Sequence, residues 1–176
     1  MPGFVTTARP SPDKASIMPA ITPMFWFDGQ AEDAARFYVS IFPNSRITHI
    51  QRYPDAGREV HGHAAGTVMV AAFELDGQPY TALNGGPQFK FSEAVSFVID
   101  CSDQSEVDHY WNALSAGGPP EAQQCGWLKD RWGVSWQVVP RRLIELLGDP
   151  ARATRTMQAL LPMKKIDIAA LERAAG

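Results

Sequence analysis

The sequence contains the same pattern of elements twice, and this repeat restricts the possible folds more than any other feature. A strand, a helix and three strands follow one another over residues 21–83, and a strand, a helix and two strands over 95–139. When the first half is shifted by about 72 residues, residues of similar character coincide. The matching pairs are Phe25 with Phe97, Asp28 with Asp100, and Tyr38 with Tyr110. We therefore predict an α+β fold of two related units, although two generic strand–helix units can also match by chance.

Local signals place the elements within each unit. Pro43 follows the first helix and stops it, and Asp76-Gly77 is a hairpin signal. We expect a polar loop at 54–66 and an N-cap at Asp167. The predicted strands are 21–27, 46–53, 68–75, 80–83, 95–100, 123–129 and 134–139, and the predicted helices are 31–42, 103–116, 141–147, 151–161 and 166–175.

The chain divides into an arm and one domain. Residues 1–17 contain three prolines and little apolar content, so we predict a flexible arm. Residues 18–176 are predicted to form a single domain. It would consist of a first module (18–91), a second module (92–140) and a C-terminal helical extension (141–176), whose apolar stripes must cover either the sheets of the same chain or a second subunit.

Charge and composition exclude several classes of function. The formal net charge is −3 and the charges are mixed along the chain, so nothing favours nucleic acid or an anionic membrane as a partner. No apolar run approaches the roughly 20 residues that cross a bilayer, and the N-terminal segment does not resemble a signal peptide. We therefore expect a cytoplasmic protein. Its two cysteines form neither a disulfide framework nor a zinc motif.

Six stretches of the sequence are distinctive: ITPMFWFDGQAEDAARFYVSIFPNSRI, FELDGQPYTALNGGP, FSEAVSFVIDC, EVDHYWNALSAGG, MKKIDIAAL and, most specifically, QCGWLKDRWGVSWQVVP. Together they resemble the PhnB-like branch of the glyoxalase/bleomycin-resistance/dioxygenase (vicinal-oxygen-chelate) superfamily. Members of this branch often carry the name 3-demethylubiquinone-9 3-methyltransferase. The resemblance covers residues 21–171. It implies paired βαβββ modules whose strands curl into partial barrels, a pocket between the sheets, and a homodimer.

The resemblance also locates a metal site. Enzymes of the superfamily hold a divalent metal through His, Gln or Glu side chains from the first and last strands of each module. The matching positions here are Pro23-Met24, Thr81, Ser96 and Gln137. They supply one amide and two hydroxyls, with no imidazole or carboxylate, so we predict no metal and no other cofactor. Thr81, Ser96 and Gln137 then either satisfy one another or line the pocket.

Two histidines offer the remaining route to a metal. His61 and His63 are two residues apart and would share a face on a strand, with Glu59 as the nearest carboxylate. A solvated loop is the alternative interpretation.

Three further residues are candidates for the pocket, each with a structural alternative. Cys125 would meet a ligand or be a buried, inert thiol. Trp127 would form a pocket wall or pack in the core. Asn84 would donate to a ligand at the pocket mouth or serve the turn before Gly85-Gly86.

These observations favour a metal-independent protein that binds a small molecule between its sheets, with the ligand and any catalytic residues unidentified. The alternative is a divalent-metal-dependent enzyme of the superfamily. A methyltransferase ranks third, because its cofactor requires a glycine-rich turn between a strand and a helix. The only glycine pair after a strand, Gly85-Gly86, is followed by proline.

Overall fold

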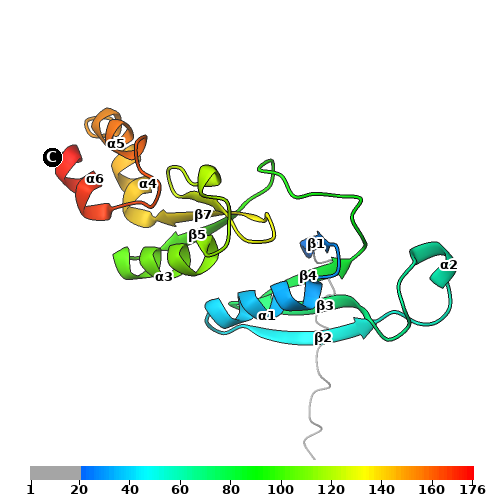
Figure 1. The fold of residues 1–176 in the computed structure, drawn as a ribbon. Helices are drawn as coiled ribbons and strands as arrows, with labels where there is room; N and C mark the ends of the chain where they lie inside the picture. Colours follow the sequence, from blue (N-terminus) through cyan, green and yellow to red (C-terminus); the bar gives the residue numbers. More distant parts are fainter. Residues whose placement is uncertain (1–20) are drawn as a thin grey trace, which may run out of the picture.

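The computed structural model describes residues 21–176, so the predicted arm at 1–17 lies outside the described residues (Figure 1). In each half, a strand and a helix are followed by further strands, and the chain ends in three helices within the described residues. The strands are β1 (Met24–Phe27), β2 (Arg46–Arg52), β3 (Val68–Leu75), β4 (Gln78–Asn84), β5 (Phe97–Cys101), β6 (Trp127–Lys129) and β7 (Ser135–Pro140). The helices are α1 (Ala31–Ile41), α2 (Arg58–His61), α3 (Gln104–Ser115), the 3-10 turn η1 (Pro120–Ala122), α4 (Arg141–Gly148), α5 (Ala153–Leu160) and α6 (Ile168–Ala175).

The first module is a four-stranded sheet in the order β1-β4-β3-β2 with α1 on one face. β1 runs parallel to β4, and the other pairs are antiparallel. Alternate residues of β3, such as Ala71 and Phe73, are buried on the side of α1. Their neighbours lie on the opposite face, which we call the open face of the sheet. Met24 and Thr81 lie opposite each other there, on adjacent strands.

The second module repeats this topology with three strands, in the order β5-β7-β6. β5 runs parallel to β7, as β1 does to β4, and α3 packs on the sheet. The strand predicted at 123–129 is shorter than expected, because Cys125 and Gly126 have left-handed φ angles of 52° and 88° that interrupt an extended backbone. Only an isolated bridge from Gln124 to Trp127 precedes β6. The predicted α+β glyoxalase-like fold class is confirmed, with a second sheet one strand short of a full βαβββ unit among the described residues.

An aromatic core joins the two modules. Phe25 of β1 lies with its ring centroid 5.0 Å from that of Phe97 of β5. In the same core, the hydroxyl of Tyr38 in α1 donates a 2.7 Å hydrogen bond to the carboxylate of Asp130. Asp130 is fully buried in the turn between β6 and β7, and sequence reasoning did not single it out. A buried polar contact therefore links the modules within this aromatic core.

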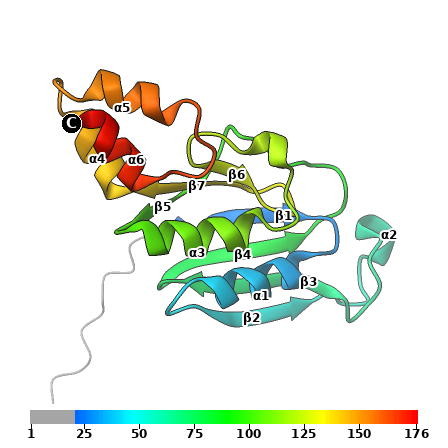
Figure 2. The ribbon, with the colours of Figure 1, turned by 60° about the vertical axis from the view of Figure 1, so that its left-hand side comes forward.

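The C-terminal helices form a second apolar cluster beside β7 (Figure 2). Its buried members are Leu143, Leu146, Leu160, Ile166, Leu171 and Ala175. The predicted N-cap is confirmed, since the Asp167 carboxylate accepts a 2.9 Å hydrogen bond from the amide of Ala170. These helices therefore pack on one another, and α4 contacts β7 of the second sheet in the same chain. None of the helices within residues 21–176 is long and apolar enough to cross a membrane.

The region 54–66 differs from the predicted loop, because it contains the one-turn helix α2. Glycines with left-handed φ angles, Gly57 and Gly62, lie at both ends of this turn. They reverse the chain direction and allow a single helical turn to form between them.

Candidate functional site

The four positions that correspond to the superfamily's metal ligands lie on the open faces of the two sheets. In the second sheet, the open face is the one opposite α3. Met24 is exposed, and the Thr81 hydroxyl lies 3.4 Å from the carbonyl oxygen of Pro23. In the second module, the side-chain amide of Gln137 donates a 2.9 Å hydrogen bond to the hydroxyl of Ser96. A thioether, two hydroxyls and an amide that already donates to its neighbour do not fit a hard divalent ion.

His61 and His63 pack against Tyr53 instead of converging on an empty site. Their ring centroids lie 4.5 Å and 4.4 Å from that of Tyr53. The Nδ1 atom of His61 accepts a hydrogen bond of 3.1 Å from the backbone amide of His63, which occupies one potential ligand atom. Over residues 21–176, no three His, Cys, Asp or Glu side chains group as they would around a metal ion.

Asn84 holds the start of α1 and is almost fully buried. Its Oδ1 atom accepts a 2.8 Å hydrogen bond from the amide of Ala31, and its Nδ2 group donates to the carbonyl of Val68 at 3.0 Å. The Tyr53 hydroxyl donates to the backbone carbonyl of Asn84 at 2.6 Å. An amide that satisfies one of the unpaired N–H groups of α1 has a structural role. No local sequence pattern indicates this contact, because Ala31 and Asn84 are 53 positions apart.

The two cysteines belong to the structural framework. Cys125 is half-buried, with its Sγ atom 3.5 Å from the Leu160 carbonyl oxygen, and it packs against the C-terminal cluster. Cys101 is fully buried at the end of β5, and burial together with nearby carboxylates raises its pKa to about 12. Trp127 is half-buried on β6. Neither Cys125 nor Trp127 lines the cavity between the two sheets.

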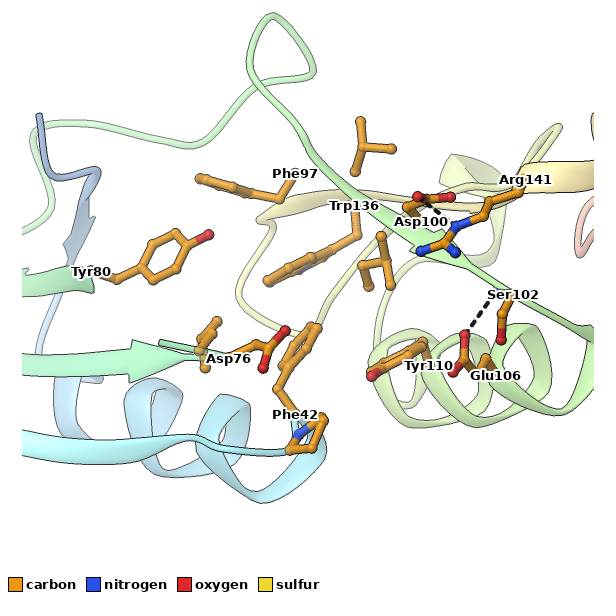
Figure 3. Close-up of a pocket in the computed structure, with 14 residues that line it drawn as sticks. Phe42, Asp76, Tyr80, Phe97, Asp100, Ser102, Glu106, Tyr110, Trp136 and Arg141 are labelled. Atoms are coloured by element: carbon orange, nitrogen blue, oxygen red, sulfur yellow. Dashed lines mark hydrogen bonds and ion pairs between the residues drawn. The ribbon is translucent and has the colours of Figure 1, made fainter. Parts of the chain in front are cut away.

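A cavity of about 660 Å³ lies between the two sheets (Figure 3). Its lining combines strands of both modules with the end of α1 and one face of α3. The aromatic members are Phe42, Tyr80, Phe97, Tyr110 and Trp136. A volume of this size is within the range of about 300–1,000 Å³ that is usual for small-molecule sites.

These aromatic rings form a continuous row along the cavity (Figure 3). Phe42 stacks on Tyr110 with centroids 5.0 Å apart, and on Trp136 at 5.7 Å. Trp136 in turn lies 5.5 Å from Phe97, and Phe97 lies 5.7 Å from Tyr80. The row supplies broad apolar ring surface for a flat or apolar ligand.

Charged groups surround this row. Asp76, Asp100 and Glu106 are carboxylates of the lining, and Arg141 is its only cation. Arg141 Nε donates to Asp100 Oδ2 at 2.9 Å, so these two charges largely offset each other (Figure 3). Glu106 accepts a 2.7 Å hydrogen bond from the amide of Ser102. The cavity therefore combines an aromatic wall with a negative rim.

The pKa of the Tyr110 phenol reflects its position among these rings and carboxylates. Burial raises the pKa of its phenol above the usual value, and the charges of Glu106, Cys101 and Asp76 raise it further. The cavity thus favours neutral or positive groups near this hydroxyl.

None of the six residues predicted from the sequence to meet a ligand lines this cavity. The structure brings Ser96, Gln137 and Trp127 together, because Gln137 donates to Ser96 and lies opposite Trp127 in the β6–β7 pair. It places Thr81 on the other sheet, while Asn84 holds the start of α1 and Cys125 packs against the C-terminal cluster. Sequence reasoning did not name the aromatic lining as a site. Its only signal was the high content of tryptophan and phenylalanine, which does not say which rings meet.

Comparison with known proteins agrees with this geometry. The profile of a family named 3-demethylubiquinone-9 3-methyltransferase matches residues 19–139. A PhnB protein from Bacillus cereus, whose structure carries the same name, is 32% identical over 69% of this chain and 99% of its own, with a TM-score of 0.59. Protein PA1353 from Pseudomonas aeruginosa is 20% identical over 70% of this chain and 98% of its own, with a TM-score of 0.53, which supports the fold alone. No protein with a curated function matches the chain. The chain therefore belongs to the family named 3-demethylubiquinone-9 3-methyltransferase, the PhnB-like branch of the glyoxalase-like superfamily.

Proposed function

We propose that this protein binds a small organic molecule in the cavity between its two sheets, without a catalytic metal. The observation that carries the proposal is the aromatic row within a 660 Å³ cavity between the modules. The chemistry of Met24, Thr81, Ser96 and Gln137, which are poor ligands for a divalent ion, supports the second part. The proposal names no reaction.

The turn at Gly85-Gly86 supports binding over the methyl transfer in the family's name. Both amides donate to the carbonyl of Phe27, and the chain continues through residues 87–96 into β5. A glycine-rich turn that binds a nucleotide cofactor leads directly into a helix, whose N-terminus receives the charged group. Gly85 instead makes room for Trp26, because a Cβ atom there would lie 2.2 Å from the indole ring.

A compound screen with two tryptophan variants tests the proposal. A ligand at about 100 times its Kd adds about 2.7 kcal/mol of stability, so true ligands should raise the Tm by several degrees. Ser102 is exposed at the cavity, and we expect Ser102→Trp to obstruct the entrance and abolish these shifts. Ser105→Trp is the matched control, because Ser105 is equally exposed on α3 but does not line the cavity. A broad screen without stabilising compounds, or compounds whose shifts survive Ser102→Trp, would contradict the proposal.

We also propose that two copies pair through the open faces of their sheets. Large apolar side chains remain exposed there and on the adjoining α4, with Met24 at 60%, Val98 at 61% and Ile144 at 61% exposure. Apolar groups exposed on neighbouring elements are typical of protein interfaces. We expect light scattering to give the mass of a dimer at micromolar concentration, and Val98→Lys to give that of a monomer, because an unpaired charge would be buried. Glu121→Lys, in the exposed turn η1, should leave the dimer intact. A wild-type monomer would refute the pairing.

A further inference from the structure

The charge of the cavity carries an inference about the ligand, and this inference rests on the proposed function. Three carboxylates line the cavity against one guanidinium. Arg141 is already engaged by Asp100. Asp76 and Glu106 have no Lys, Arg or His within ion-pair distance in the described part of the chain. Two negative charges are thus left without a cationic partner at the rim.

Both unpaired carboxylates lie close to one end of the aromatic row. Figure 3 shows Asp76 on one side of Phe42, and Glu106 beside Tyr110 on α3. Each carboxylate also acts on the Tyr110 phenol, raising its pKa after the larger effect of burial. Their hydrogen bonds come from neutral groups only: the Asn44 side chain donates to Asp76 at 3.2 Å, and the Ser102 amide donates to Glu106 at 2.7 Å. Neutral donors leave the charges of both carboxylates in place.

The adjacent rings favour the same sign of charge. The face of an aromatic ring is negative, and a cation over it gains about 0.5–1 kcal/mol at an exposed site. Phe42 and Tyr110 stack on each other with an interplanar angle of 27°, and Phe42 also stacks on Trp136. A ligand that combines an ammonium group with an apolar body would place the charge near Asp76 and Glu106 and the body along the remaining rings.

We propose that the cavity selects an organic cation, an amine or quaternary ammonium carried on an aromatic or alkyl body, over neutral and anionic molecules of the same shape. Asp76 and Glu106 supply the attraction, and the row from Tyr110 to Tyr80 supplies the apolar contact. An organic anion would approach two carboxylates that form no ion pair in the described part of the chain, so it is the least favoured class.

Matched probes on the full chain test this selection. Three aryl groups (phenyl, indolyl and naphthyl) are each presented as the 2-arylethylamine, the 2-arylethanol and the 3-arylpropanoate, and binding is measured by calorimetry. For at least one aryl group we expect the amine to bind about tenfold more tightly than the alcohol, and the carboxylate to show no binding. The affinity for the amine should fall with added salt, while that for the alcohol should not.

A charge-neutralising double variant locates the effect. Asp76→Asn with Glu106→Gln keeps the hydrogen-bond acceptors but removes both charges, so the amine should bind only as tightly as the alcohol, whose affinity stays unchanged. Asp33→Asn with Glu121→Gln is the matched control. It makes the same change in net charge at exposed positions outside this cavity, and the preference for the amine should persist.

The outcomes separate this inference from the proposed function. Equal binding of amine and alcohol, or tighter binding of the carboxylate, overturns the inference and leaves a binding cavity of another selectivity. The inference also falls if no amine binds while neutral screening compounds stabilise the protein in a manner that Ser102→Trp abolishes. If no compound of either set binds, both proposals fail.

Discussion

Replacing Asp130 by asparagine should lower the free energy of unfolding by about 2–4 kcal/mol. The Asp130 carboxylate is fully buried and accepts four hydrogen bonds. They come from the Tyr38 hydroxyl (2.7 Å), the Trp136 indole N–H (2.9 Å) and the amides of Trp132 (2.9 Å) and Val134 (3.0 Å). Two donors reach each carboxylate oxygen. In either orientation, an asparagine would direct its own NH₂ group at two of these donors and leave them unsatisfied.

The environment of Asp130 explains why the loss should exceed that of a single hydrogen bond. Burial raises the pKa of this carboxyl, and the four donors oppose the rise. The donors therefore offset the cost of removing the carboxylate from water, and they are themselves buried by the same packing. Losing one acceptor oxygen leaves either Tyr38 and Trp136, one from each module, or the amides of Trp132 and Val134 without an acceptor in the core that joins the modules.

Urea unfolding of two variants measures the effect. Tyr38→Phe is the comparison, because it removes one donor but leaves the carboxylate and three of its hydrogen bonds. We expect a loss of about 1 kcal/mol for Tyr38→Phe and a clearly larger one for Asp130→Asn, each seen as a lower midpoint with an unchanged slope. If Asp130→Asn unfolds at the wild-type midpoint, the network does not stabilise the core as inferred.

Elements with strong local signals were predictable from the sequence. The bounds of β3 are those expected, because alternating apolar residues are followed by the hairpin signal Asp76-Gly77. Helix α1 begins at the predicted Ala31 and ends before Pro43, which cannot continue a helix. The cap at Asp167 also follows from a single residue type in its local context.

Contacts between distant residues were not predictable in this way. Tyr38 and Asp130 are 92 positions apart, and nothing in the sequence around either residue names the other. Because Asp130 is a charged residue, its residue type predicts a position at the surface. Its burial is possible because four hydrogen-bond donors surround the carboxylate. The left-handed backbone at Cys125 was equally hidden, because only the glycine beside it has a residue type that signals this conformation.

The site residues expected on the strands differ by one position in sequence from residues that line the cavity. Thr81, Ser96 and Gln137 were chosen because they align with the metal ligands of the superfamily. Their neighbours in sequence, Tyr80, Phe97 and Trp136, line the cavity instead. Successive side chains on a strand point to opposite faces of the sheet. The family's metal positions therefore map to the open faces, and the aromatic row faces the space between the modules.

Replacing Gly126 by alanine should lower the free energy of unfolding by about 2–4 kcal/mol, because two independent costs coincide at this position. Gly126 has a φ angle of 88°, which costs an L-residue about 1 kcal/mol or more. An added Cβ atom would also lie 2.8 Å from Ile166 Cδ1 and 2.9 Å from the Val138 carbonyl oxygen. Overpacking of this kind typically costs about 1–3 kcal/mol.

The surroundings of Gly126 leave little room for relaxation. Its amide donates to the Lys164 carbonyl at 2.8 Å, and its carbonyl accepts from the Val138 amide at 2.8 Å. Val138 belongs to β7, the central strand of the second sheet, and Ile166 is fully buried in the C-terminal cluster. A shift that accommodates the methyl group would disturb the junction of the sheet with the C-terminal helices. This steric demand accounts for the glycine within the QCGWLKD stretch without a direct role in ligand binding.

Gly148→Ala provides the matched control for this variant. Gly148 is the last residue of α4, and a Cβ atom there would meet nothing within 4 Å. The same substitution should therefore leave stability unchanged or raise it by up to about 1 kcal/mol, since alanine favours the helix. Urea midpoints of the two variants test the contrast. Equal midpoints would show that the backbone at Gly126 adapts, and that the junction of the second sheet with the C-terminal helices is less rigid than its hydrogen bonds indicate.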